Sequence, residues 1–397
     1  MASRSRNFIV SLASIAIIMF FSLLTGCGGA SSNQSSNSTN TGNSNGSTGT
    51  STSAVSYAYA ASAGAIDAYS VGADGSLTAV PGSPYSASTD NYIVTNGANL
   101  YTVDKAGSTL QTYAVNKSNG SLSLTSSSNA IQGNPFAQDI VGSLALDHTG
   151  TSLYVGEYDS SGDDGFGVFD VSGATPKFVS YLSASEAFGP PLVFSPDNNS
   201  AYTGNCYQGT WSVFGYKRAA DGSLSTFDPG VGAQAPPQSD PDTMYCPASF
   251  AVSAKGFLAI GYSELNGSST LYMVGMYKIN FDGTLTALPT SVIGTASNTT
   301  SNGRLAISFD PTGTYLAVAG NAGVQTFPLT ANGILPPIGA PQDSGVDFQN
   351  VSWDKSNHVF ATSQTQLYVY TSQDGRLTAA PGSPHAGGAG LAVLPLQ

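Results

Sequence analysis

The chain has 397 residues, of which only 9% are charged, and its formal net charge is −12. Ordinary soluble proteins contain roughly 25% charged residues, so hydroxyls and amides must solvate most of this surface. A net negative protein is a poor partner for nucleic acid or for an anionic lipid surface, and we predict no nucleic-acid binding. The 20 tyrosines and 18 phenylalanines supply enough bulk for a hydrophobic core.

The first residues have the pattern of an export signal. Arg4 and Arg6 precede an apolar run at residues 8–24, which is too short and too close to the N-terminus for a typical membrane span. The run ends in Leu-Thr-Gly-Cys, which resembles the cleavage box of bacterial lipoproteins. We therefore predict that residues 1–26 are a signal peptide and that Cys27 is lipidated. An ordinary secretion signal or an uncleaved anchor is the alternative.

Lipidation at Cys27 would place the protein at a membrane. Two or more acyl chains on one residue anchor a protein stably, and no Asp follows Cys27 directly. By resemblance to lipoprotein sorting signals, we expect an exported, lipid-anchored protein at the outer membrane. Residues 27–54 are rich in Ser, Asn, Gly and Thr and have almost nothing to bury, so they are predicted to be a disordered tether.

A repeated unit fills the remaining residues, 55–397. The segment at 57–84 returns at 359–384, and each copy has two β-type runs, an Asp-Gly pair, and a Pro-Gly-Ser-Pro corner. A repeat with this period is typical of a toroidal or solenoid array. Asp-Gly or Asn-Gly pairs predict two-residue hairpin turns, since both residues tolerate positive φ. These pairs stand at Asp74-Gly75, Asn119-Gly120, Asp221-Gly222, Asp282-Gly283, Asn332-Gly333 and Asp374-Gly375.

The two ends of this region complement each other. The first unit begins directly with its second strand, at Tyr57, and the surplus strand Gly390–Leu396 stands at the other end. We predict an all-β fold, a seven-bladed β-propeller of four-stranded blades, in which the C-terminal strand completes the first blade and closes the ring. Closure would leave no long exposed sheet edge. An open β-solenoid or a tandem of β-sandwiches would not explain the displaced strand.

Several short motifs resemble the lactonase-type seven-bladed propeller family, which includes bacterial 6-phosphogluconolactonase and cyclic-muconate lactonising enzymes. They are Ser195-Pro196-Asp197, Asp310-Pro311-Thr312-Gly313-Thr314-Tyr315-Leu316, Leu153-Tyr154-Val155 and Trp211-Ser212-Val213-Phe214. The resemblance spans about residues 56–397. It implies the propeller fold and, as an expectation, lactone hydrolysis in the central channel.

The resemblance is incomplete where the family's enzymes keep a Gly-Pro-Arg-His element and a Glu that ends the second strand of the same blade. Pro191 and Leu192 stand roughly where Arg and His would be, and Cys206 stands where the Glu would be. Lactone hydrolysis needs a cation for the developing oxyanion and a base for water. If the protein is an enzyme, we expect Arg304 to act with Glu157 or Glu264.

The longest departure from the repeat is the insertion at residues 230–247, and long propeller loops often carry function. We predict binding residues among the loops of one face, and a Cys206–Cys246 disulfide that pins the insertion, since an exported compartment permits disulfides. Two buried free thiols are the alternative. The predicted binding residues are Tyr158, Tyr207, Asp240, Asp242, Tyr245 and His385.

The remaining chemistry is sparse. There is no Asp-x-Asp-x-Asp-Gly loop, so we predict no cofactor and no metal site, with Ca²⁺ as the cation that the acidic loops would favour. His148 and His358 fall in turns of the opposite face and are expected to be solvated. We therefore expect a monomeric binding module at the cell envelope, with a carbohydrate, a peptide or an envelope protein as partner. The alternatives are a lactonase-like hydrolase and a structural scaffold.

Overall fold

The computed structural model describes most of the region after residue 52. The described residues are 53–62, 64–89, 92–104, 109–133, 140–158, 165–184, 191–207, 210–230, 244–266, 269–288, 293–295 and 305–396. They belong to one compact unit, Ser51–Gln397. Every regular element among them is a β-strand, and this part of the chain holds no helix with the length and apolarity that crossing a bilayer requires.

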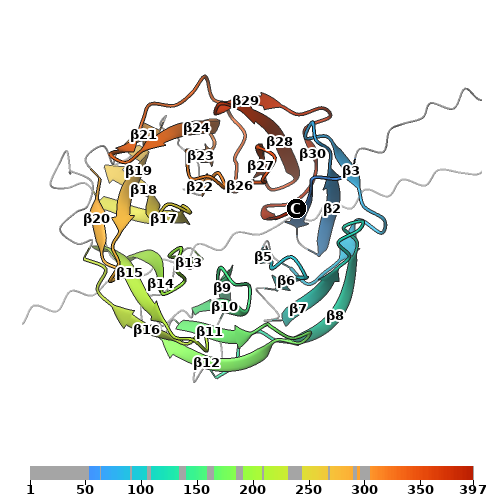
Figure 1. Ribbon diagram of the computed structural model, residues 1–397, viewed down its shortest axis with the longest axis horizontal. Coiled ribbons are helices and arrows are strands. Elements are labelled where there is room, and N and C mark those ends of the chain that lie inside the picture. The colour runs from blue at the N-terminus through green and yellow to red at the C-terminus, as the bar shows by residue number, and fades with distance from the viewer. Residues whose placement is uncertain are drawn as a thin grey trace, which may run out of the picture. The chain divides into compact units, whose positions relative to one another are not determined.

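The strands form seven antiparallel sheets, which are the seven predicted blades (Figure 1). From the inside outwards, blade 1 contains β31 (Gly390–Pro395), β1 (Ser56–Ser62), β2 (Ala65–Val71) and β3 (Leu77–Ala79), with β4 (Tyr85–Ser86) also beside β2. Blade 2 contains β5 (Tyr92–Thr95), β6 (Asn99–Val103), β7 (Thr109–Val115) and β8 (Leu122–Asn129). Blade 3 contains β9 (Ile140–Leu146), β10 (Ser152–Tyr158), β11 (Gly165–Asp170) and β12 (Lys177–Ser183).

The other four blades repeat this order. Blade 4 contains β13 (Val193–Phe194), β14 (Ser200–Tyr207), β15 (Thr210–Arg218) and β16 (Leu224–Phe227). Blade 5 contains β17 (Met244–Val252), β18 (Phe257–Asn266), β19 (Ser269–Ile279) and β20 (Leu285–Ala287), with β21 (Ile293–Thr295) also beside β19. Blade 6 contains β22 (Ala306–Phe309), β23 (Tyr315–Gly320), β24 (Gly323–Thr330) and β25 (Gly333–Ile334). Blade 7 contains β26 (Asn350–Trp353), β27 (His358–Thr362), β28 (Gln366–Gln373) and β29 (Arg376–Ala379), with β30 (His385–Ala386) also beside β28.

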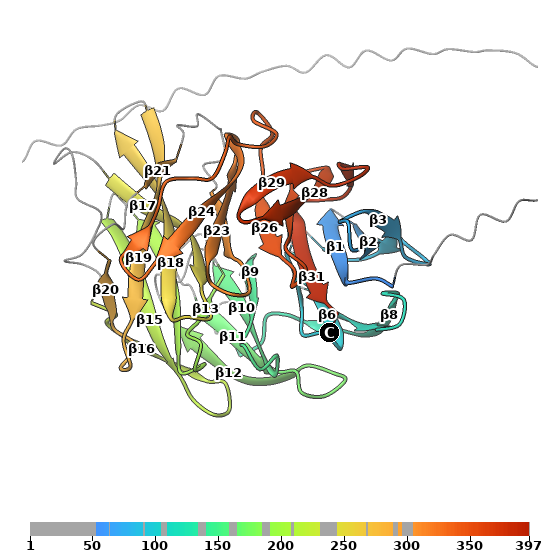
Figure 2. The same cartoon turned by 45° about the horizontal axis from the view of Figure 1, so that its top comes forward.

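The predicted ring closure is confirmed. Strand β31 pairs with β1 in antiparallel register, from Gly390 opposite Ala61 to Pro395 opposite Ser56. Figure 2 shows β31 beside β1, although the two come from opposite ends of the described chain. The first blade therefore takes its innermost strand from the end of the sequence, and β31 covers the inner edge of β1.

The core is divided among the seams between blades. Seven clusters of buried side chains are present in the described residues, and each joins two neighbouring blades. The cluster between blades 7 and 1, for example, packs Phe360 and Val369 against Ala58 and Val71, all fully buried. Alternate residues of each strand point to the two faces of its sheet, so every blade contributes to two seams.

Tyrosines of the second strands reinforce three of these seams. The hydroxyl of each donates a hydrogen bond to the carbonyl of the glycine in the next blade's outer hairpin. The pairs are Tyr59 with Gly120 at 3.0 Å, Tyr154 with Gly222 at 2.8 Å and Tyr202 with Gly283 at 2.7 Å. The glycine of these hairpins thus has two roles: it adopts the positive φ of the turn, and its carbonyl accepts a hydrogen bond from the neighbouring blade.

The outer hairpins differ in length from the two-residue turns that the sequence predicts. All six repeated glycines have positive φ, but only some of the turns have two residues. Asp374 and Gly375, with φ of 49° and 80°, form a two-residue turn between paired Gln373 and Arg376. At Gly75, Gly222 and Gly283 the loop has three residues, with the glycine at its end. This is a type I turn followed by a left-handed glycine, the next most common hairpin connection.

The strand boundaries differ most at the long insertion. The innermost strand of blade 5, β17, begins at Met244, which lies within the insertion at residues 230–247. Cys246 therefore lies inside a strand and not at the end of a loop. Because β18 is also long and pairs with β17 from Leu265 inwards, the sheet of blade 5 extends further than its repeat pattern predicts.

Candidate functional site

The connections of the blades define two ends of the ring. The turns between first and second strands and the outer hairpins lie at one end, which we call the turn end. The loops between second and third strands and the connections between blades lie at the other, which we call the loop end. This follows because consecutive strands of each blade are antiparallel, so successive connections lie alternately at the two ends.

Most predicted site residues fall at the loop end, but the structure describes few of their side chains. Arg304, Asp240, Asp242 and Cys27 lie outside the described residues. The backbones of five others lie at the loop-end termini of strands, and their side chains are not described. They are Tyr158 in β10, Tyr207 and Cys206 in β14, Tyr245 in β17 and Glu264 in β18. Cys246 also lies at this end, in β17.

Glu157 is the predicted acid whose side chain is described. It lies near the loop-end terminus of β10, next to a β-bulge at Gly156, and is only 1% exposed. Its Oε1 would lie 2.9 Å from a Cβ placed on Gly167 of the neighbouring strand β11. The absence of a side chain at Gly167 therefore makes room for the carboxyl group inside the blade. Burial of this kind is one way in which proteins prepare a general base.

The innermost strands contribute no acid or base to the middle of the ring. Within their bounds, β5, β9, β13, β17, β22, β26 and β31 contain no Asp, Glu, Lys, Arg or His. Figure 1 shows six of them, β5, β9, β13, β17, β22 and β26, around the centre of the ring. Among the described residues, charged groups that could reach a ligand there must come from second strands, such as Glu157, or from loops.

His385 is the predicted binding residue that the structure describes most fully. It lies in β30, and its ring centroid is 5.7 Å from that of Tyr69 in β2, across the seam between blades 7 and 1. Tyr69 in turn donates a hydrogen bond to the carbonyl of Ala386. Burial lowers the pKa of His385, so its imidazole is neutral at pH 7. A neutral imidazole can donate and accept hydrogen bonds to an uncharged ligand.

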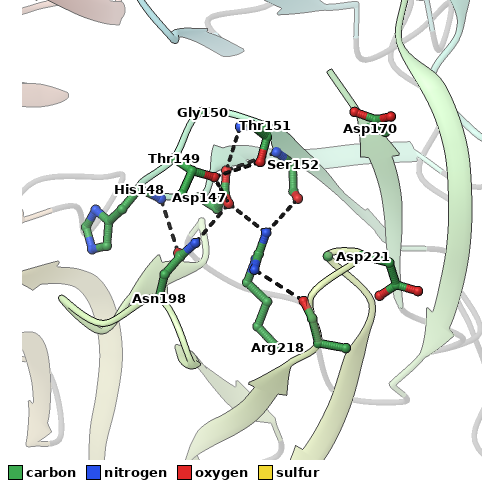
Figure 3. Close-up of polar contacts among 12 residues, drawn as sticks. Asp147, His148, Thr149, Gly150, Thr151, Ser152, Asp170, Asn198, Arg218 and Asp221 are labelled. Atoms are coloured by element: carbon green, nitrogen blue, oxygen red, sulfur yellow. Dashed lines mark hydrogen bonds and ion pairs between the residues drawn. The ribbon is translucent and has the colours of Figure 1, made fainter. Parts of the chain in front are cut away.

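A larger polar network, which the sequence did not reveal, lies at the turn end between blades 3 and 4 (Figure 3). The guanidinium of Arg218 at the end of β15 lies 2.8 Å from the Asp147 carboxylate, in the turn between β9 and β10. Arg218 also donates to Ser152 at 2.9 Å and to Tyr154 at 3.1 Å. The side chain of Asp147 is fully buried and that of Arg218 is 10% exposed, so the pair is shielded from solvent.

Asp147 has a complete set of donors. Its oxygens also accept hydrogen bonds from the Thr149 hydroxyl, the Asn198 side chain and the backbone amides of Thr151 and Ser152. Burial acts to raise the pKa of Asp147, but these hydrogen bonds and the charge of Arg218 outweigh it and hold the pKa below its usual value. The network is saturated by protein groups, which indicates a structural connection between blades and not a ligand site.

The turn-end histidines also have structural partners. The prediction that His358 is solvated was wrong, because it is 1% exposed and pairs with Asp354 at 2.8 Å. His148 is exposed, and its Nε2 lies 2.9 Å from the carbonyl of Phe194 in blade 4. Over the described residues, no group of three or more His, Cys, Asp or Glu side chains is arranged to hold a metal ion.

Several solved structures share this architecture. A periplasmic gluconolactonase from Pseudomonas aeruginosa superposes with a TM-score of 0.63 at 18% identity, over 86% of this chain and 99% of that one. A putative 6-phosphogluconolactonase from Bacteroides fragilis gives 0.63 at 15% identity, over 87% and 99%. One from Bacteroides uniformis gives 0.62 at 16% identity, over 86% and 100%.

This chain has the seven-bladed propeller fold of these structures. No protein-family model and no curated protein sequence matches it, so the likeness lies in the fold alone. The chain departs from the Gly-Pro-Arg-His element of the lactonase-type enzymes at Pro191 and Leu192, which follow the end of blade 3 and precede β13. The side chain of Leu192 is 4% exposed and belongs to the apolar seam between blades 3 and 4, so this position serves packing.

Proposed function

We propose that the protein is an exported, lipid-anchored propeller whose loop end binds an uncharged, hydroxyl-rich ligand such as a carbohydrate. The observation that carries the proposal is the absence of acidic and basic residues from all seven innermost strands. A site built from such strands recognises its ligand through neutral hydrogen bonds and aromatic contacts, which are the usual means of orienting ligands in small-molecule pockets. The neutral His385 at the loop end agrees with this reading.

Lactone hydrolysis is the second candidate. It is supported by the structural likeness to a periplasmic gluconolactonase and to two putative 6-phosphogluconolactonases, and by the buried Glu157 at the end of β10. Glu157 would activate the attacking water, and Arg304 would stabilise the oxyanion that forms when the ring carbonyl is attacked. The periplasmic location of one of these neighbours also agrees with export.

One preparation can separate the two functions. The full chain with Cys27→Ser would be secreted in soluble form and tested with glucono-lactone and with a panel of neutral sugars. Saturable sugar binding by calorimetry without lactone turnover above buffer supports the binding module. Turnover that is lost in Glu157→Gln and kept in Glu264→Gln supports the hydrolase. If neither binding nor turnover occurs, both proposals fail, and co-purifying envelope proteins would indicate a scaffold.

The lipid anchor rests on the sequence pattern around Cys27. Labelling cells with a radioactive fatty acid should mark the wild-type protein and not the Cys27→Ser variant. The wild-type protein should also partition into the detergent phase of a Triton X-114 separation. Labelling that persists in the variant would refute the anchor, while leaving the ligand proposal to its own test.

The predicted Cys206–Cys246 disulfide remains part of this proposal. Cys246 lies in β17, and Cys206 lies at the loop-end terminus of β14, in the neighbouring blade. A bridge between them would tie blades 4 and 5 together and fix the end of the insertion. Peptide mapping without reductant should recover a peptide pair that contains Cys206 and Cys246. Recovery of both as free thiols would refute the bridge.

A further inference from the structure

The seam between blades 7 and 1 contains a buried carboxylate that must be ionised. Asp354 lies in the turn between β26 and β27, and its Oδ2 accepts hydrogen bonds from the Ser56 hydroxyl and from Nδ1 of His358, both at 2.8 Å. Its Oδ1 accepts from the backbone amides of Ser356 at 2.8 Å and His358 at 2.9 Å. Burial acts to raise the pKa of Asp354, but its hydrogen bonds with His358 and Ser56 and the charge of His358 outweigh burial and hold the pKa below its usual value.

The imidazole of His358 lies between two acceptors. Nδ1 faces Asp354, and Nε2 lies 3.3 Å from the carbonyl oxygen of Ala73, in the outer hairpin of blade 1. A neutral imidazole has only one N–H and would leave one of these contacts as two facing acceptors. Only the imidazolium donates to both. Because the residue is 1% exposed, water cannot replace the missing donor at low cost.

The groups around this imidazole favour its charged form. Asp354 and Asp74 are the titratable groups that act on it, and the nearby Ser56, Thr371 and Phe360 side chains are neutral. Burial acts to lower the pKa of His358, but the hydrogen bond and charge of Asp354, the Ala73 carbonyl and the charge of Asp74 outweigh it. The pKa therefore lies above its usual value of 6.5.

In two equivalent turns of other blades, the aspartate is paired with groups other than histidine. Asp147 in blade 3 is paired with Arg218, which stays charged at every relevant pH. Asp310 in blade 6 is satisfied by the Thr312 hydroxyl and by backbone amides in the same turn. Among these three described turns, the one at the ring closure is the one that relies on histidine.

We propose that closure of the ring is coupled to a proton: His358 is held as an imidazolium between Asp354 and the Ala73 carbonyl, so that a rise in pH loosens the seam between blades 7 and 1. Loss of this proton leaves a lone pair facing a carbonyl oxygen at the one seam that joins the beginning and the end of the folded region. An exported protein meets the pH of its surroundings directly, so its ring closure would respond to that pH. The contacts of His358 do not depend on the proposed ligand binding at the loop end, so the two proposals are tested separately.

The sign of the effect follows from linkage. The folded state holds its proton to a higher pH than the unfolded state does, so the stabilisation is fully present below pH 6.5 and is lost as the pH rises through the folded pKa. One proton changes the folding equilibrium by at most about tenfold per pH unit. Amide exchange in β1 and β27 should report the same change locally.

The test compares the full chain carrying Cys27→Ser with the same chain carrying His358→Gln. Urea unfolding and amide exchange, corrected for intrinsic rates, would be measured from pH 6 to pH 9. We expect the stability of the parent to fall by up to about tenfold in equilibrium constant per pH unit, with faster exchange in β1 and β27. The dependence should vanish in His358→Gln and persist in His148→Gln, a control at an exposed histidine of the same end.

A parent chain whose stability is flat over this range, or a His358→Gln chain that keeps the parent's slope, would overturn the proposal. If His358→Gln does not fold, the Cε1 proton of His358 can be titrated by NMR in the parent chain. A midpoint above 6.5 supports the proposal, and a midpoint at or below 6.5 refutes it.

Discussion

Replacing Arg218 with methionine would break the buried ion pair between blades 3 and 4. The side chain loses its bonds to Asp147, Ser152, Tyr154 and the carbonyl of Ala219. Removing one partner of a buried pair costs about 3–5 kcal/mol. Because Asp147 keeps two side-chain donors and two backbone amides, the lower limit applies, and we expect a loss of about 3 kcal/mol.

This loss is measurable by urea unfolding at pH 7. With an m-value of about 3 kcal/mol/M, the unfolding midpoint should fall by about 1 M. Arg376→Met is the matched control, because Arg376 is exposed at the start of β29, and a surface substitution of this kind changes stability by about 0.5 kcal/mol or less. The double variant Arg218→Met with Asp147→Asn should recover part of the loss, since no uncompensated charge remains.

Two results would refute the reasoning. One is a midpoint shift of Arg218→Met that is no larger than that of Arg376→Met, which would mean that the ion pair contributes no net stability. The other is exact additivity of the two single changes in the double variant, because groups in direct contact are expected to show a coupling energy.

The remaining predictions concern other seams and turns. Tyr202→Phe should cost about 1 kcal/mol in urea unfolding, because the carbonyl of Gly283 loses its donor; no loss would show that water replaces the hydroxyl. Gly222→Ala should destabilise by more than about 1 kcal/mol, since φ is 90° and a Cβ would lie 2.6 Å from the Ser152 hydroxyl; unchanged stability would contradict the close approach. The lowered pKa of Asp147 contributes stability that is present above its usual pKa of 3.8 and is lost as the pH falls below it. Because the Arg218→Met variant is less stable from the outset, its acid unfolding should begin at higher pH. An unchanged acid profile would show that Arg218 and Asp147 do not contribute to stability in acid.

The architecture could be predicted because each blade is encoded by a local sequence repeat. Asp-Gly or Asn-Gly pairs and second strands recur from blade to blade, and the strand at Gly390–Leu396 supplies the one that the first unit lacks. The number of residues in each turn could not be predicted, because two- and three-residue hairpins both place glycine at a position of positive φ. The start of β17 at Met244 was also missed, because it lies in the insertion that breaks the repeat.

The seams were much harder to predict than the blades. Arg218 and Asp147 are distant in the sequence, and nothing local to either residue shows that they meet. A signal was nevertheless present, because Asp147, Asp310 and Asp354 recur at the same position of the turn between first and second strands. An acid that recurs before a buried strand indicates a structural partner, and His358 would then have been read as that partner and not as a solvated residue.

Pairing of β31 with β1 also constrains the order of biosynthesis. Strand β1 leaves the ribosome early, and its inner hydrogen-bonding edge stays without a partner until β31 has been synthesised. A nascent or truncated chain therefore presents an open sheet edge, which is prone to aggregation. Late completion of the first blade also makes an incomplete product easier for proteases to recognise, because the strands beside its open edge lack their partner.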